Sequence, residues 1–166
     1  MRRKDREMPE SFAYGVADKC EWAVLSMLDP DGAPYGVPLS IAREGTRIYF
    51  HCAPDGAKTA ALRAHADVCL VCVGDTHRMA DKFTTEYESA ILRGTVSEVR
   101  DAEEKIRALQ MLCLRHTPLN MAAFDEAVAK SLARTAVWRI DVTDITGKRK
   151  KYDARGVEMK FGRMEE

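Results

Sequence analysis

Apolar and polar residues alternate along the chain with the two-residue period of β-strands, most regularly in residues 135–144. There Ala136, Trp138, Ile140 and Val142 fall on one face, and the residues between them are mostly polar. Further strands are predicted at residues 21–28, 34–43, 46–52, 67–74 and 85–99, with turns at 29–32 and 44–45. Gly94, in the middle of the longest of these segments, predicts a bulge or a sharp bend.

Helical periodicity is confined to excursions between the strands. It predicts helices over residues 9–19 and 56–65, a longer one from 101 to about 115, and a helical piece over 121–133. Asp101 and Glu104 have the spacing of a capping box at the start of the long helix. Residues 76–83 are expected to be irregular. The expected fold is therefore mainly β with flanking helices: an antiparallel, Greek-key-like barrel, closed or nearly closed, with peripheral helices.

Length and composition indicate a single domain. No repeat or linker divides the 166 residues, so one domain is expected over 1–166, with an N-terminal helical arm at 1–19 and a C-terminal tail at 147–166. The 26 basic and 26 acidic residues cancel and are spread along the chain, which disfavours a nucleic-acid partner. No segment approaches the roughly 20 apolar residues that cross a bilayer, so a soluble cytoplasmic protein with no membrane partner is expected.

The five cysteines favour reduced thiols over a disulfide framework. Cys69 and Cys72 have the spacing of metal ligands, but they fall in an apolar strand, where residues three apart point to opposite faces. Cys20 and Cys113 lie where free cysteine behaves as a small hydrophobic residue. The histidines show no ligand spacing with one another or with a carboxylate, so no metal site is expected.

Residues 48–62 have the features of a phosphate-binding turn. An apolar strand ends in a turn that contains Gly56, and the following helix begins with Lys58 and Thr59. The unpaired N–H groups of a first helical turn, the positive end of the helix dipole and a nearby ammonium together favour a bound phosphate. Taken alone, the pattern also fits an ordinary strand-to-helix turn that binds nothing.

Three stretches of the sequence match one protein family in their order and spacing. They are CEWAVLSMLDPDGAPYGVPLSIA from Cys20, IYFHCAPDGAK from Ile48 and KFTTEYESAILRGTVSEV from Lys82. Over nearly its whole length, the chain resembles the FMN-binding split barrels related to pyridoxamine 5′-phosphate oxidase, and among them the nitroimidazole-resistance (Nim) type.

The resemblance implies a homodimer that holds one FMN at each of two clefts between the subunits. Residues implied to run beside the isoalloxazine are Gly36, Val37, Pro38, Leu39 and Ser40. Residues implied to contact the ribityl chain are His51, Cys52 and Ala53, and those implied to hold the phosphate are Lys58 and Thr59. Glu88 and Ser89 are implied to face the ring from across the subunit interface.

One position departs from the family pattern. Many relatives carry His or Arg immediately before the lysine of the phosphate turn, whereas this chain has Ala57. A hydrogen bond to a charged group is worth roughly 1.5–3 kcal/mol, so the FMN affinity is expected to be lower by about one to two orders of magnitude unless Arg63 or another cation substitutes.

His51 is the candidate catalytic residue. Strand alternation turns it away from Phe50 and Cys52 and towards the implied flavin, to which it could donate a hydrogen bond or a proton. The alternative is a polar strand-end residue satisfied by backbone or water. Hydroxyls near residues 84–89 could orient a substrate or could simply belong to strand-forming residues. The basic run 148–151 could close over an anionic cofactor or touch nucleic acid, but a solvated tail is expected.

The main functional hypothesis is an FMN-dependent oxidoreductase. FMN would accept electrons from a nicotinamide cofactor or another donor and pass them to a small aromatic or nitro-type acceptor. The alternatives are a non-catalytic flavin carrier or sensor, and a split barrel that holds haem or deazaflavin.

Overall fold

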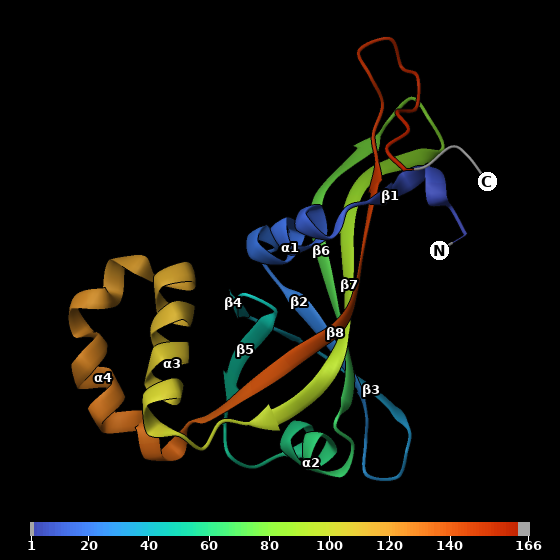
Figure 1. Cartoon of the computed structure of the whole chain (residues 1–166). Coiled ribbons are helices and arrows are strands. Elements are labelled where there is room, and N and C mark those ends of the chain that lie inside the picture. The colour runs from blue at the N-terminus through green and yellow to red at the C-terminus, as the bar shows by residue number, and fades with distance from the viewer. Residues whose placement is uncertain (1, 163–166) are drawn as a thin grey trace.

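A computed structural model describes residues 2–162 of the chain, which contain one antiparallel sheet of eight strands. The strands are β1 (Glu7–Met8), β2 (Ala23–Leu28), β3 (Pro34–Leu39), β4 (Ala42–Glu44), β5 (Arg47–Cys52), β6 (Asp67–Met79), β7 (Thr84–Glu98) and β8 (Ala136–Lys150). Their order in the sheet is β3-β2-β6-β7-β8-β5-β4, and β1 pairs with the C-terminal part of β8 (Figure 1).

The sheet closes into a split barrel because its two edge strands are consecutive in the chain. β3 ends at Leu39 and β4 starts at Ala42, so Ser40 and Ile41 carry the chain from one end of the strand order to the other. Within residues 2–162, β3 pairs only with β2, and β4 pairs only with β5. One edge of β3 therefore keeps its backbone groups free.

Alternate side chains of the strands fill the inside of the barrel. Leu25 of β2 and Leu92 of β7 are buried, whereas their neighbours Val24 and Ile91 are 42% and 40% exposed. The alternation predicted for residues 135–144 is confirmed, because Ala136, Trp138 and Ile140 all belong to this core.

The helices lie around the barrel. A 3-10 turn (Lys4–Arg6) and β1 precede α1 (Glu10–Lys19), which packs across β6, β7 and β8; α2 (Ala57–Ala64) lies near β2. α3 (Ala102–His116) packs on β4 and β5, and a 3-10 segment (Pro118–Ala123), α4 (Phe124–Ser131) and a 3-10 turn (Leu132–Arg134) lead to β8. α3 and α4 stand to one side of the barrel over a second apolar cluster (Figure 1). None of the helices in residues 2–162 has the length and apolar character that a membrane crossing requires.

Two local predictions are confirmed by the backbone. The Asp101 carboxylate accepts a hydrogen bond from the Glu104 N–H at 2.8 Å, which caps α3. The register of β7 against β8 shifts between Arg93 and Gly94, as expected of a bulge. A Cβ at position 94 would overlap the backbone of Asp141, so the bulge requires glycine.

Three predicted boundaries are wrong, each because tertiary pairing overrides the local pattern. The strand predicted at 34–43 breaks at Ser40, where the chain changes neighbours. Residues 76–79, expected to be irregular, extend β6 because they pair with β7. The last strand, predicted to end at residue 144, continues to Lys150, so residues 147–150 of the predicted C-terminal tail pair with β7 and, at 147 and 148, with β1. Met1 and residues 163–166 of the predicted arm and tail lie outside the described residues.

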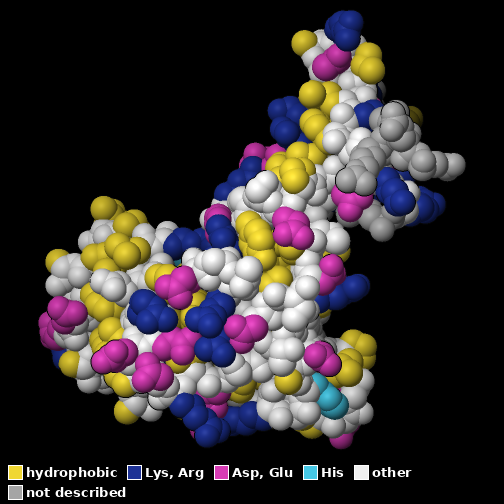
Figure 2. Space-filling model, in the orientation of Figure 1, with side chains coloured by type: hydrophobic (Ala, Val, Ile, Leu, Met, Phe, Trp, Pro, Cys, Tyr) yellow, Lys and Arg dark blue, Asp and Glu magenta, His cyan; other side chains and the backbone are white. Residues whose placement is uncertain are grey.

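The extended strands form an arm that projects from the barrel. The arm consists of residues 75–87 and 148–162, and Figure 2 shows basic and hydrophobic side chains mixed along it. Phe83, at the turn between β6 and β7, is fully exposed there.

Candidate functional site

Three basic side chains gather where β5 ends, α2 begins and α3 ends. His51 is the next-to-last residue of β5, Lys58 lies in the first turn of α2, and His116 is the last residue of α3. The charges of Lys58 and His116 both act on the His51 ring. We call these three residues the basic corner. The structure thus brings together two residues singled out from the sequence and adds a third.

The surroundings of His51 favour its neutral form. Part of its side chain reaches the surface, and its neighbours shield the rest of the ring from water. This partial burial lowers the pKa of His51 below its usual value, and the charges of Lys58 and His116 lower it further. A neutral imidazole has one N–H donor and one acceptor nitrogen. An anion in the basic corner would offset the charge of Lys58 and favour a proton on His51.

His116 is held at the break between β3 and β4. Its Nε2 lies 2.9 Å from the carbonyl oxygen of Ile41. Because a carbonyl oxygen can only accept, Nε2 carries the hydrogen. In the sequence, the only signal of His116 was a basic residue in the last turn of a helix, a common way of complementing the helix dipole.

The turn before α2 leaves one free ammonium. The N-cap of α2 is Gly56, with a φ of 132°. Because glycine has no side chain, the N-cap residue offers no side-chain acceptor to the first-turn N–H groups. Thr59 is buried, and its hydroxyl donates to the Gly56 carbonyl at 2.9 Å. Lys58 makes no ion pair within residues 2–162, and its Nζ lies 5.9 Å from the Phe50 ring. Lys58 is therefore the side chain of this turn that can meet an anion.

Arg63 does not replace the basic residue missing at Ala57. Its guanidinium donates to the Pro54 carbonyl at 3.0 Å and lies 3.6 Å from a Glu98 oxygen. His116, in contrast, is a basic side chain that acts on the His51 ring. The additional basic side chain of the basic corner thus comes from α3.

The remaining predicted residues of β5 and its turn differ in exposure. Cys52 is half-buried towards the barrel core, and burial raises the pKa of its thiol. Ala53 is exposed directly after the strand. Of these two, only Ala53 lies at the surface beside the turn.

β3 connects the basic corner with the outer surface of the sheet. Gly36 and Pro38 are exposed, whereas Val37 and Leu39 pack against the core and can meet a ligand only through their backbone. Pro38 pairs with Val24 on the outer surface, and three residues later the Ile41 carbonyl contacts His116. A ligand lying along β3 would therefore reach both the outer surface of the sheet and the basic corner.

The outer surface of the sheet carries a continuous apolar row. Pro38, Val24, Val71 and Ile91 are register partners across β3, β2, β6 and β7, and Ile91 pairs with Thr146 of β8. Two further apolar side chains lie exposed beside this row, Trp22 at 58% and Val73 at 49%. We call this surface the outer face.

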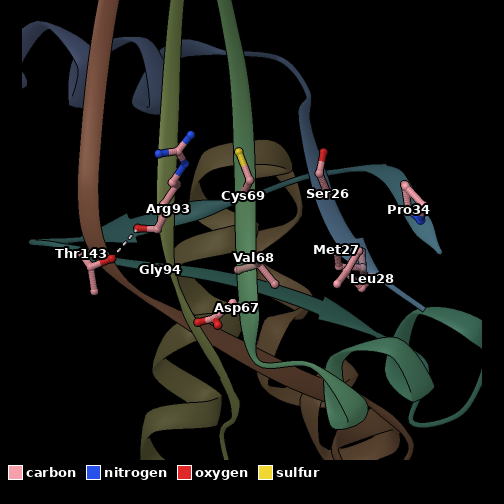
Figure 3. Close-up of a pocket in the computed structure, with 10 residues that line it drawn as sticks. All are labelled: Ser26, Met27, Leu28, Pro34, Asp67, Val68, Cys69, Arg93, Gly94 and Thr143. Atoms are coloured by element: carbon pink, nitrogen blue, oxygen red, sulfur yellow. Dashed lines mark hydrogen bonds between the residues drawn. The ribbon is translucent and has the colours of Figure 1, made fainter. Parts of the chain in front are cut away.

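Two hollows on the outer face meet at Arg93. The larger, of about 470 Å³, lies mainly over β2, β6 and β7. In Figure 3, Ser26, Cys69 and Arg93 project the same way from these strands, and the Thr143 hydroxyl donates to the Arg93 carbonyl at 3.3 Å. The smaller, of about 320 Å³, lies over β7 and β8 and is lined by Ser89, Ile91, Arg93, Asp144, Thr146 and Lys148.

Glu88 and Ser89 have different surroundings. Glu88 is buried and forms ion pairs with Lys19 of α1 and, at 3.3 Å, with Arg149. Ser89 lines the smaller hollow. Of the two residues expected to face a flavin ring, Ser89 is the one whose side chain opens on the outer face.

Sequence reasoning did not single out Arg93, and it named Lys148 only as part of a basic run that could close over an anionic cofactor. Both line the smaller hollow, one on β7 and the other on β8. Their alternation with buried residues was the available signal, but Lys148 lies in the segment that was expected to be a tail. Within residues 2–162, no group of three or more His, Cys, Asp or Glu residues could hold a metal ion.

Comparisons with known proteins agree with this architecture. The model of the family described as pyridoxamine 5′-phosphate oxidase matches residues 17–149. The chain has no match among curated proteins.

Several solved structures share the fold. A candidate 5-nitroimidazole antibiotic resistance protein from Bacteroides thetaiotaomicron is 23% identical, with a TM-score of 0.71 and 86% of each chain covered. An FAD and haem binding protein from Mycobacterium smegmatis is 19% identical, with a TM-score of 0.71 over 95% of this chain and 75% of that chain. The haem storage protein HutZ from Vibrio cholerae is 13% identical, with a TM-score of 0.64 over 84% and 94%. At these sequence identities, the comparisons show that the fold is shared.

Proposed function

We propose that this chain, which belongs to the pyridoxamine 5′-phosphate oxidase family, is an FMN-dependent oxidoreductase that reduces a small aromatic or nitro compound. The observation that carries the proposal is the basic corner at the start of α2, joined through β3 to the outer face. A phosphate group needs a basic environment such as the basic corner, and a flat ring needs an apolar surface such as the outer face. A flavin nucleotide has these two groups at its two ends.

The residues present fit an FMN. Lys58 and the first-turn N–H groups of α2 would hold the terminal phosphate, with His116 as a further basic side chain in place of the missing one at position 57. Backbone groups on the free edge of β3, from Gly36 to Ser40, would meet the polar edge of the ring. His51 and the exposed Ala53 would adjoin the ribityl chain.

Bound FMN would supply the electron and hydride transfer. The role of the protein is then to orient the ring and to tune it. The surroundings of His51 favour its neutral form, and a bound phosphate that offsets the charge of Lys58 would let the ring gain a proton more readily. This makes His51 the group that can donate a hydrogen bond or a proton at the cofactor.

We also propose that two copies of the chain form the site. Trp22, Val24 and Val73 leave apolar surface exposed on the isolated chain, which is typical of a protein interface, and Ile91 lies beside them in the smaller hollow. Pairing of two outer faces would bury this surface. It would also bring Ser89 of one copy towards the β3 edge of the other.

An absorbance spectrum of the purified protein, followed by titration with FMN, tests the proposal. We expect a bound flavin spectrum, and steady consumption of NADH or NADPH when a nitroaromatic acceptor is added. Bound flavin without turnover would favour a carrier or sensor. A Soret band, or no flavin binding at saturating FMN, would overturn the proposed cofactor.

A further inference from the structure

The smaller hollow on the outer face is built from three neighbouring cross-strand pairs. They are Ser89 with Lys148, Ile91 with Thr146, and Arg93 with Asp144. Every second residue of a strand points to the same side, so these six side chains share one face. The hollow therefore has a polar pair at each end and an apolar residue in the middle.

Lys148, at one end, has no carboxylate partner within residues 2–162. The two cations that follow it are engaged, since Arg149 pairs with Glu88 and Lys150 bonds to the Thr84 hydroxyl. The Nζ of Lys148 lies 5.9 Å from the Tyr87 ring, a cation–π distance that leaves its three donors free.

Arg93, at the other end, is only weakly paired. Its guanidinium lies 3.9 Å from a carboxylate oxygen of Asp144, and the two side chains are 70% and 57% exposed. An ion pair this long and this exposed contributes little, so the guanidinium can bind another group. Two cations and one carboxylate give the hollow a net charge of +1.

The middle of the hollow suits a flat ring. Ile91, 40% exposed, offers an apolar surface, and Ser89 and Thr146 place hydroxyls at its margin. The volume of about 320 Å³ is at the small end of the range for ligand pockets, which begins at roughly 300 Å³. A single ring with one or two polar substituents matches this size and lining.

We propose that the hollow binds a small aromatic anion, with the ring on Ile91, the anionic group on Lys148 and Ser89, and a second polar substituent towards Arg93. This rests on the proposed function, because it identifies the ring as the compound that exchanges electrons with the flavin of the paired copy. Lys148 is then the residue that selects charged over neutral rings.

Calorimetric titration of the full chain, with FMN present, tests this selectivity. The probes are 4-nitrobenzoate and its neutral analogue 4-nitrobenzamide, with 4-nitrophenyl phosphate to distinguish a carboxylate ligand from a phosphate ligand. A hydrogen bond to a charged group corresponds to about a ten- to hundredfold difference, so the wild type should bind at least one anion that much more tightly than the amide. Lys148→Met should abolish the preference, and Lys148→Arg should retain it.

Lys151→Met is the matched control, since this exposed lysine lies three residues further on and outside the hollow. It should leave the preference unchanged. Ser89→Ala, which removes only a hydroxyl, provides a second variant and should weaken anion binding without affecting the amide. Equal affinity of the wild type for anions and amide, or an unchanged preference in Lys148→Met, would overturn the inference.

The FMN titration distinguishes failure of this inference from failure of the proposed function. If FMN binds and no anion is preferred, only the inference fails. If an anion binds in a Lys148-dependent manner while FMN does not bind, the proposed function fails, and so does the acceptor role given to the ring.

Discussion

Lys58 and Arg63 lie in the same short helix, but only Lys58 belongs to the basic corner. Arg63 is engaged with the Pro54 carbonyl and Glu98 on its own side. We therefore predict that Lys58→Ala weakens FMN binding by about ten- to a hundredfold, the value of one hydrogen bond to a charged group. Titration followed by flavin fluorescence measures this. Arg63→Ala is the control and should change the affinity little; equal losses in the two variants would contradict the assignment.

His51 gives the folded chain a pH-dependent stability. Burial and two neighbouring charges hold its pKa below that of the unfolded state, which is about 6.5. The unfolded state therefore binds more protons as the pH falls below that value, and the free energy of unfolding decreases. Urea unfolding of the flavin-free protein at pH 8 and at pH 5 should show a smaller loss in His51→Gln than in the wild type.

His77→Gln is the control for this measurement, because His77 is exposed on β6 and lies outside the basic corner. Its pH dependence should match that of the wild type. A His51→Gln variant that loses as much stability as the wild type between the two pH values would show that His51 does not carry the effect.

At the scale of the elements, one glycine in a strand and one in a helix should respond to alanine in opposite ways. Gly94 forms the bulge of β7, where a methyl group would overlap the Asp141 backbone, so Gly94→Ala should destabilise the fold by about 3 kcal/mol. Gly15 lies in α1, and nothing lies within 4 Å of the place that a methyl group would take there, so Gly15→Ala should stabilise by about 0.5–1 kcal/mol. Thermal unfolding of both variants checks the opposite signs.

The elements with strong local signals were predictable from the sequence, and those set by pairing were not. The alternation of residues 135–144 and the capping carboxylate of Asp101 identified β8 and α3 correctly. The break at Ser40 has no local cause. It arises because the residues before it pair with β2, as β3, and the residues after it pair with β5, as β4. The same holds for residues 147–150, whose polar sequence pairs with β7 and β1.

The candidate site was predictable to the same extent. His51 and Lys58 are close in the sequence and were found together. His116 approaches them only because α3 packs on β4 and β5, and Lys148 faces the hollow only because β8 continues along β7. Side chains contributed by distant elements carry no local pattern that marks them, so the fold has to be known first.

For the whole molecule, the main question is what covers the outer face. The apolar row from Pro38 to Ile91 runs across four strands and stays open on the isolated chain, although the same strands bury their other side in the core. A stable interface buries about 1,200–2,000 Å² in total, and the exposed apolar side chains of this face would contribute to that area. The proposed flavin site depends on this contact, because it takes residues from both copies.

Val24→Lys tests the proposed dimer and the shared site together. Val24 lies in the centre of the apolar row and is 42% exposed, so the isolated chain should accept lysine without loss of fold. In a dimer the same lysine would be buried without a partner, at a cost of several kcal/mol, and the dissociation constant should rise by about a hundredfold or more. Sedimentation equilibrium should show monomers, and FMN binding should be lost at the same protein concentrations.

Leu119→Lys is the control, at a fully exposed leucine between α3 and α4, and it should leave both the dimer and FMN binding intact. A Val24→Lys protein that still dimerises would exclude the outer face as the interface.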